Sequence, residues 1–322
     1  MYLIMEKDDY FKIKLGISSC LLGEKVRFDG GHKKNSYILG VLTQYFSFVP
    51  FCPEVEAGLG TPREPIRLLK EGSDIKCVGV KTPEWDVTEQ LEAVAKPKRE
   101  WQRSLCGYIL KKDSPSCGMA RVKVYSKGAP NRTGVGLFAK GLMNNFPHLP
   151  IEEEGRLQDP HLRENFIQRV YIYSRWLNLQ EQGCSLGALQ NFHARHKYIF
   201  MSHNQQKAKE LGGLIATHEE LNLDTLIERY LAEMMSLLKT IATRKNHVNT
   251  MQHIQGYLKK HLNTDDKEEL SEMITNYRLG VLPLIVPLTM LRHHFRKYPN
   301  EYIEHSFYMD PHPGEMMLLN HI

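Results

Sequence analysis

The pattern of hydrophobic and polar positions changes part-way along the chain. In the first half, short apolar runs predict β-strands at 13–18, 48–51, 76–80, 108–111 and 121–125. Helical stretches are predicted between them at 37–46 and 84–105, and another helix opens near Gly136. Strands that alternate with helices predict a parallel or mixed sheet covered on both faces.

From Asp159 onward the apolar positions recur at helical spacing. Asp159 followed by Pro160 is typical of a helix cap with proline in the first turn, and predicts a helix to about Leu179. The segment EQGCSLG interrupts this pattern, and further helices are predicted at 188–201, 205–217, 223–262 with a break, 265–277 and 284–295. The predicted fold class is an α/β N-terminal domain with a parallel or mixed sheet, followed by an all-α C-terminal domain.

The length of 322 residues is sufficient for two domains that each bury a core. We expect a first domain over 1–160, a linking helix and turn over 161–190, and a helical domain over 191–322. The apolar part of the N-terminus is too short for a signal peptide, and no apolar run reaches the roughly 18 residues of a membrane-spanning helix. We therefore expect a cytoplasmic protein with no membrane partner.

Positive charge is concentrated in one region. Eleven Lys and Arg residues stand between Lys96 and Lys140, against Glu100 and Asp113 alone. This clustering favours a polyanionic partner, although a solvated basic face is the alternative. Twelve of the fifteen histidines lie between His193 and His321, and they are able to stack on bases or bind phosphate. Three of these histidines, His193, His196 and His203, are considered as metal ligands. A metal site is disfavoured because no carboxylate or cysteine accompanies them at a recognisable spacing.

The six cysteines should be reduced in the cytoplasm, and none forms a CxxC or another compact metal-binding spacing. Three of them lie in loops rich in glycine and proline, where backbone approaches a ligand closely: Cys20 in SSCLLG, Cys52 in FCPEVEAGLGTPREP and Cys117 in DSPSCG. The others are expected to be core or incidental residues: Cys77, Cys106 and Cys184. The residues alone leave ligation, catalysis and packing open for the first three.

Three segments together resemble the motifs of the thiouracil desulfurase family, in the same order. They are SSCLLGEKVRFDG, CPEVEAGLGTPREP and KKDSPSCGMARV, and the resemblance extends from about residue 13 to residue 156. The segments FHARHKYIFMSHN and PHPGEMMLLNHI resemble the helical domain that is found fused to that family. Proteins with this fusion are similar to bacterial desulfidases that convert 4-thiouridine in tRNA to uridine, with the helical domain binding the tRNA.

The resemblance implies a 4Fe-4S cluster held by Cys20, Cys52 and Cys117, with one iron left open for the substrate sulfur. It implies hydrolytic desulfuration without net electron transfer. It also points to Glu54 as acid or base and to Ser114 as a hydrogen-bond or proton-relay partner. The sequence does not indicate what accepts the sulfide.

Other roles stay open for several of these residues. Glu54 is alternatively a surface carboxylate paired with Arg63 or Arg67, and Ser114 a plain turn residue. The second-tier candidates are residues that would orient water or hydrogen-bond cluster sulfurs: Asp29, Ser19 and Glu56. Asp29 before Gly30 is equally a turn signature. Two alternative functions are desulfuration of free thiouracil, and an RNA-binding or sensory iron–sulfur protein without desulfuration activity.

Overall fold

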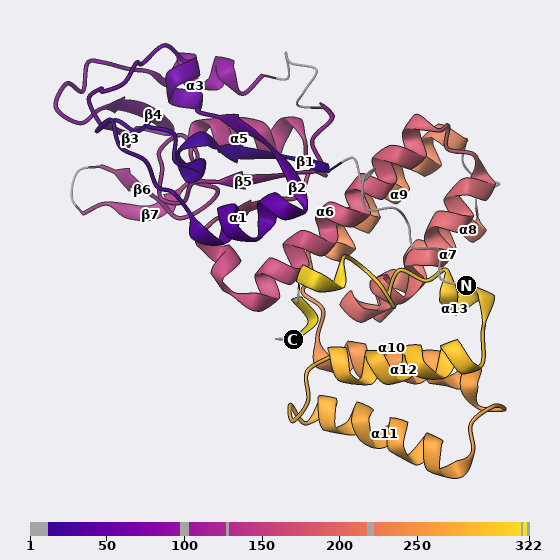
Figure 1. The fold of residues 1–322 in the computed structure, drawn as a ribbon. Helices are drawn as coiled ribbons and strands as arrows, with labels where there is room; N and C mark the ends of the chain where they lie inside the picture. The colour runs from indigo at the N-terminus through magenta and orange to yellow at the C-terminus, as the bar shows by residue number, and fades with distance from the viewer. Residues whose placement is uncertain (1–11, 97–102, 127–128, 218–221, 317, 321–322) are drawn as a thin grey trace. The chain divides into compact units, whose positions relative to one another are not determined.

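The computed structural model describes residues 12–96, 103–126, 129–217, 222–316 and 318–320 (Figure 1). The chain divides into two compact units between Leu157 and Gln158. Both β-sheets lie in the first unit, and the described part of the second is helical. The predicted fold class is therefore confirmed. Some predictions fall on residues outside the described ranges. They concern the apolar stretch at the N-terminus, the middle of the helix predicted over 84–105, and four of the charged residues counted between Lys96 and Lys140: Lys98, Arg99, Glu100 and Lys127.

Four parallel strands form the first sheet. They are β1 (Ile13–Ser18), β2 (Phe46–Phe51), β5 (Gly107–Leu110) and β8 (Ile151–Glu153), in the order β2-β1-β5-β8. The chain leaves β1 for β2 on one side and later adds β5 on the other side. The carboxyl ends of these three strands consequently meet at one edge, where open α/β sheets bind ligands.

Buried side chains hold this sheet against its helix. Leu15, Ile17 and Tyr108 have no exposed surface, as expected for parallel strands covered on their faces. Helix α5 (Leu137–Asn145) contributes Phe138, whose ring centroid lies 5.3 Å from that of Phe51 and 5.9 Å from that of Tyr108. These aromatic contacts fix the start of α5 beside the carboxyl ends of β2 and β5.

A second, mixed sheet has the order β4-β3-β6-β7. Its strands are β3 (Ile66–Glu71), β4 (Asp74–Gly79), β6 (Val122–Tyr125) and β7 (Asn131–Gly134). Only the β3–β6 pair is parallel among the pairings of these described strands. Helix α3 (Thr88–Val94) covers the sheet, and Leu91 packs with Leu68 and the fully buried Cys77 in one core. Cys77 is thus a core residue, as expected.

Some predicted elements differ from the observed ones. The helix expected over 37–46 is shorter: α1 covers Ser36–Gly40, a 3₁₀ turn follows at Leu42–Gln44, and Phe46 already pairs with Ile13 in β2. The extended conformation prevails because Phe46 gains a buried position in the sheet. Strands β3, β7 and β8 were not predicted, since β7 is polar and β8 has three residues.

The helical unit is built around a large core of buried apolar side chains. Its helices are α6 (Pro160–Glu181), α7 (Leu186–His203), α8 (Gln205–Ala216), α9 (Leu223–Leu238), α10 (Arg244–Gln255), α11 (Thr264–Arg278), α12 (Ile285–Lys297) and α13 (Glu301–Glu304). Asp159 caps α6 and Pro160 opens it, as predicted. Trp176 stacks on Tyr230 and meets Phe192 edge-on in the core. Among the described residues, no helix combines the length and apolar character needed to cross a membrane.

Candidate active site

The three loop cysteines meet at the carboxyl edge of the first sheet. Cys20 lies in a 3₁₀ turn, Ser19–Leu22, directly after β1. Cys52 follows β2 and precedes the short helix α2 (Pro53–Glu56), and Cys117 lies in the loop that follows β5. Because β2, β1 and β5 are adjacent and parallel, all three thiols line one cavity of about 390 Å³.

The loop that carries Cys117 is held by its own backbone and by the start of α5. The Gly118 N–H donates to the Ser114 carbonyl at 2.8 Å, which closes a turn around the cysteine. The Gly136 N–H donates to the Gly118 carbonyl at 2.8 Å. A Cβ atom at position 136 would lie 2.5 Å from the Ser116 carbonyl, so the close approach of α5 requires glycine there. The position of Cys117 thus depends on a glycine nineteen residues later in the chain.

All three thiols are withdrawn from solvent to different degrees. Cys20 and Cys117 are 8% and 6% exposed, and Cys52 is half-buried. Burial, assisted by the neighbouring Cys52, raises the pKa of the Cys20 thiol to about 11. Burial also raises the pKa of Cys52 and of Cys117. Thiols of this kind release their protons when a metal replaces them, because the thiolate is the ligand.

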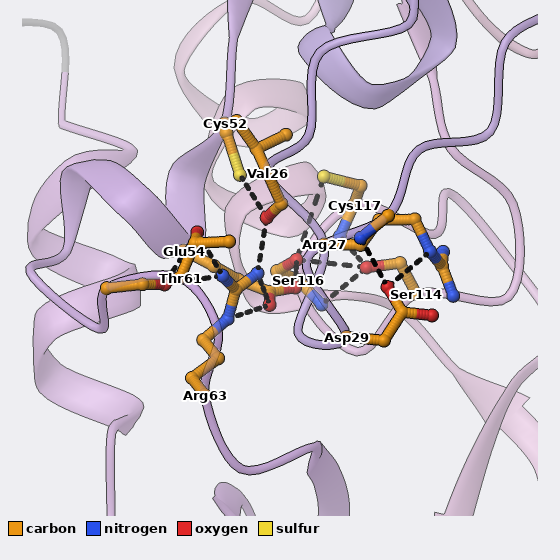
Figure 2. A network of polar contacts seen from close by, with 12 residues as sticks. Val26, Arg27, Asp29, Cys52, Glu54, Thr61, Arg63, Ser114, Ser116 and Cys117 are labelled. Carbon is orange, nitrogen blue, oxygen red and sulfur yellow. Dashed lines mark hydrogen bonds and ion pairs between the residues drawn. The ribbon is translucent and has the colours of Figure 1, made fainter.

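Glu54 lies in the same cavity and is bound on both of its oxygens (Figure 2). Its Oε2 accepts hydrogen bonds from Nε of Arg63 at 2.9 Å and from Nη2 of the same guanidinium. Its Oε1 accepts a hydrogen bond from the Ser116 hydroxyl at 2.6 Å. The side chain is 13% exposed. The carboxylate is therefore paired with Arg63, but it faces the cavity and is not a surface group.

Comparisons with known proteins were made for both halves of the chain. Residues 15–154 match the family described as 2-thiouracil desulfurase, and residues 197–313 match a family described as a protein of unknown function, DUF1722. The uncharacterized protein YbbK of Bacillus subtilis is 32% identical over 129 residues, which are 38% of this chain and 85% of that relative. The uncharacterized protein YbgA of Escherichia coli is 31% identical over 148 residues, which are 46% of this chain and 88% of that relative.

The chain belongs to the 2-thiouracil desulfurase family. A solved structure described as the [4Fe-4S]-dependent thiouracil desulfidase TudS is 30% identical, with a TM-score of 0.37, and covers 46% of this chain and 94% of that one. The desulfurase match extends from β1 to β8 and includes every residue of the cavity described above. The DUF1722 match falls in the helical unit.

The other sequence candidates occupy different positions in the desulfurase domain. Ser114 and Ser19 line the cavity together with the three cysteines. Asp29 accepts a hydrogen bond from the Gly31 N–H at 3.0 Å and faces Arg27 at 3.6 Å, in an exposed turn. Glu56 is exposed at the end of α2. Neither Asp29 nor Glu56 is among the described residues that line this cavity.

Four polar residues at this site were not predicted from the sequence as its members. Arg63 binds Glu54, and Ser116 lies between Glu54 and Ser114. Ser18 accepts the Lys111 N–H on its Oγ at 3.0 Å, and the Nζ of Lys111 pairs with Glu154. Ser116 is adjacent to Cys117 and Ser18 stands two residues before Cys20, and this proximity in the motifs is the signal that the sequence offers. The sequence alone does not decide whether Arg63 or Arg67 pairs with Glu54.

The rim of the cavity has more cations than anions. Arg27, Lys33, Lys111 and Lys112 line it with Asp113 and Glu54. Glu54 is neutralised by Arg63, and Asp113 by Arg132 at 2.8 Å. Lys33 and Lys112 are exposed and form no ion pair with any residue that the structure describes. Two positive charges are thus free to meet an anion.

The histidines considered for a metal site in the helical unit have separate hydrogen-bond partners. His193 bonds with the Tyr230 hydroxyl at 3.0 Å, His196 with the Phe192 carbonyl at 2.7 Å, and His203 with Gln168. Across the described ranges, no three His, Cys, Asp or Glu side chains are placed to bind a single metal ion.

Proposed function

We propose that this protein removes sulfur from thiolated uracil by hydrolysis, with a 4Fe-4S cluster on Cys20, Cys52 and Cys117, and that its substrate is 4-thiouridine in tRNA. The observation that carries the proposal is the meeting of three thiols from three separate loops in one cavity, beside Glu54 and Ser114. The 2-thiouracil desulfurase family supports the reaction class. The TudS structure is described as [4Fe-4S]-dependent, and the proposal extends that cofactor to this chain.

The residues of the cavity fit such a cluster. Three cysteine thiols are the donor set that iron–sulfur clusters use, and three ligands on four irons leave one iron open. Tyr108 is fully buried beside the three thiols, and its hydroxyl has no hydrogen-bond partner among the described residues. A cluster sulfide would provide an acceptor for it.

The chain's own residues would bind the base and move protons. When bound, the cluster supplies an open iron that polarises the thiocarbonyl as a Lewis acid. Arg63 holds the Glu54 carboxylate in place, and Glu54 removes a proton from the attacking water. Ser114 faces the cavity and is placed to contact the base, while Phe28, 37% exposed at the rim, offers a ring for stacking.

The charges at the rim favour a nucleotide over a free base. Lys33 and Lys112 carry positive charges without ion-pair partners among the described residues, and a neutral thiouracil has no group to use them. The phosphates of an RNA chain would bind these two lysines, and their binding releases counterions. We assign the remaining RNA contacts to the helical unit, which the desulfurase match does not cover.

Free thiouracil is the second candidate substrate. The cavity of about 390 Å³ is large enough for a single base, and its wall includes the apolar side chains of Val26, Phe28 and Phe51. A base bound in this way would need no contact from the helical unit.

The test is anaerobic reconstitution of the cluster in the full chain, followed by parallel incubation with thiolated tRNA and with free thiouracil. Loss of the thio-base absorption is followed for each substrate. The proposal expects a kcat/KM for tRNA well above that for the free base. Turnover of the free base alone would contradict the tRNA assignment, and a colourless protein that binds no iron would contradict the cluster.

A further inference from the structure

The hydroxyl of Ser116 lies between the two residues that carry the proton chemistry. Its Oγ is 2.6 Å from Oε1 of Glu54 and 2.9 Å from Oγ of Ser114, and Figure 2 shows the three side chains in a row. Ser116 has no exposed surface and is absent from the described lining of the cavity, whereas Glu54 and Ser114 both line it. Ser116 can therefore act on a substrate through its two neighbours.

The hydrogen bonds of this row have a defined direction. Each serine hydroxyl has one hydrogen, and an ionised carboxylate only accepts. Ser116 therefore donates to Glu54 at 2.6 Å, because the competing acceptor, Sγ of Cys117, is 3.6 Å away. Ser114 Oγ already accepts the N–H groups of Ser116 and Cys117, at 3.3 and 3.1 Å. Its own hydrogen is left for Ser116, so the row runs from Ser114 through Ser116 to Glu54.

We propose that Ser116 is a positioning residue that joins Ser114 and Glu54 into one proton path, a role that rests on the proposed desulfuration. When the oxygen of the attacking water bonds to the thiocarbonyl carbon, the π bond between that carbon and the sulfur breaks, and the water loses one of its two protons to Glu54. Once Glu54 is protonated the row reverses: the Glu54 O–H donates its proton to Ser116, and the Ser116 hydrogen passes to Ser114 Oγ in place of the Ser116 N–H, which lies 3.3 Å from that oxygen. The Ser114 hydrogen then passes to the base. One proton enters at Glu54 and one leaves at Ser114, so the three side chains return to their starting charge, with Glu54 again a carboxylate. When the C–S bond breaks and the C=O bond forms, the sulfur leaves as hydrogen sulfide with this proton and the second proton of the water.

The surroundings keep the row aligned. Arg63 occupies Oε2 of Glu54 with Nε and Nη2, which leaves Oε1 turned to Ser116. The backbone of Ser116 is fixed by the Ala139 N–H, which donates to its carbonyl at 3.1 Å, and by the close approach of Gly136. The transfer then requires rotation of hydroxyl hydrogens and no movement of the backbone.

The experiment compares Ser116→Ala, Ser116→Thr, Ser114→Ala and the double variant Ser114→Ala/Ser116→Ala in the reconstituted full chain. We expect Ser116→Ala to lower kcat about 100-fold while KM, iron content and Tm stay near wild-type values. Thr keeps the hydroxyl and should restore most of kcat. The double variant should be no slower than Ser114→Ala alone, because both changes interrupt one path. A proton inventory in mixed H₂O and D₂O should indicate several protons in flight for the wild type and fewer for Ser116→Ala.

Four results would overturn the proposal. An unchanged kcat in Ser116→Ala would show that the path is not used. A loss of kcat together with iron or with thermal stability would show that Ser116 is structural, as would additive effects in the double variant. A wild-type protein that desulfurises neither thiolated tRNA nor thiouracil would overturn the proposed function as well, whereas wild-type turnover confines any failure to Ser116.

Discussion

The two units of this protein use buried polar side chains in opposite ways. At the carboxyl edge of the first sheet, three thiols, a carboxylate and a serine hydroxyl all face one cavity. In the helical unit, buried histidines bond to neighbours within the core: His196 to the Phe192 carbonyl, His203 to Gln168 and His247 to the Tyr308 hydroxyl. Side chains that converge on a shared space are prepared for a ligand, whereas those bonded internally are part of the packing.

The difference begins with the secondary structure. Parallel strands bring loops from distant parts of the sequence to one edge, so Cys20, Cys52 and Cys117 meet although they are far apart in the chain. In a helix the polar residues are distributed along its length, and each polar side chain bonds to the neighbouring element that packs against it. The abundance of histidine in the helical half is therefore weaker grounds for a site than three cysteines in loops.

The largest effect is expected from removal of one of the converging thiols. Cys117→Ala leaves two thiols in the cavity, too few to hold a cluster with three protein ligands. We expect this variant to lose its bound iron and its measurable desulfuration activity. Iron analysis measures the first loss, and the thio-base absorption measures the second.

Two other cysteines are matched controls for that variant. Cys184→Ala changes a half-buried thiol of the helical unit, and Cys77→Ala changes a core thiol of the second sheet. Both should keep iron and activity, with Cys77→Ala losing some thermal stability because it leaves a small cavity. Iron loss in Cys184→Ala to the same extent as in Cys117→Ala would contradict the contrast between the units.

Glu54→Gln is expected to have the next largest effect. The amide keeps the size of the side chain and its contact with Ser116, but it cannot take a proton from water. Removal of a general base costs about 100- to 10,000-fold in rate, so kcat should fall in that range with iron content unchanged. Glu56→Gln, two residues further along and exposed, is the control and should retain activity. A fall of equal size in both variants would assign the effect to the local backbone of α2.

The sequence predicted much of this site because its main determinant is local. Each of the cysteines stands in a loop after a strand-like run, and the strand-end rule places such loops on one edge. The strand order β2-β1-β5, which makes the loops neighbours, depends on long-range packing such as Phe138 of α5 against Phe51 and Tyr108. No local pattern records those contacts.

The parts that were missed depend on long-range contacts. The role of Ser116 depends on the direction of its hydroxyl, which is set by Glu54 and by the approach of Gly136. Strand β8 has two glutamates among its three residues, and Glu152 is buried in it with Arg156 as partner. A sequence pattern assigns carboxylates to the surface unless the partner is known.

The charge of the rim allows a smaller, substrate-dependent prediction. Lys33→Ala/Lys112→Ala should weaken binding of thiolated tRNA and lower the slope of log affinity against log salt by about one for each lysine. Turnover of free thiouracil should not change, because the neutral base has no phosphate. Filter binding at several salt concentrations measures the first effect. Lys34→Ala is the control, since Lys34 is exposed next to Lys33 but is not among the described lining residues. Equal losses for tRNA and free base would refute a role of the rim in phosphate binding.

The smallest predicted effect concerns the internally bonded histidines. Burial lowers the pKa of His247 to about 4, against 6.5 for an exposed side chain, although the nearby Glu164 opposes this shift. Between pH 6.5 and pH 4 the unfolded chain takes up a proton at this residue that the folded chain does not, so stability falls as the pH falls through this window. From pH 7 to pH 5 we expect the Tm of the helical unit to drop about 5 °C more in the wild type than in His247→Gln.

The exposed His253 is the matched control for that measurement. His253→Gln should keep the pH dependence of the wild type, because His253 is exposed and takes no part in the buried core. The same pH change should leave the iron content of His247→Gln equal to that of the wild type, since Cys20, Cys52 and Cys117 lie in the first unit. Equal pH slopes in the wild type and in His247→Gln would show that His247 is not held neutral by the core. The helical histidines would then be free to take part in binding, and the contrast between thiols that converge on one cavity and histidines that bond within the helical core would fail.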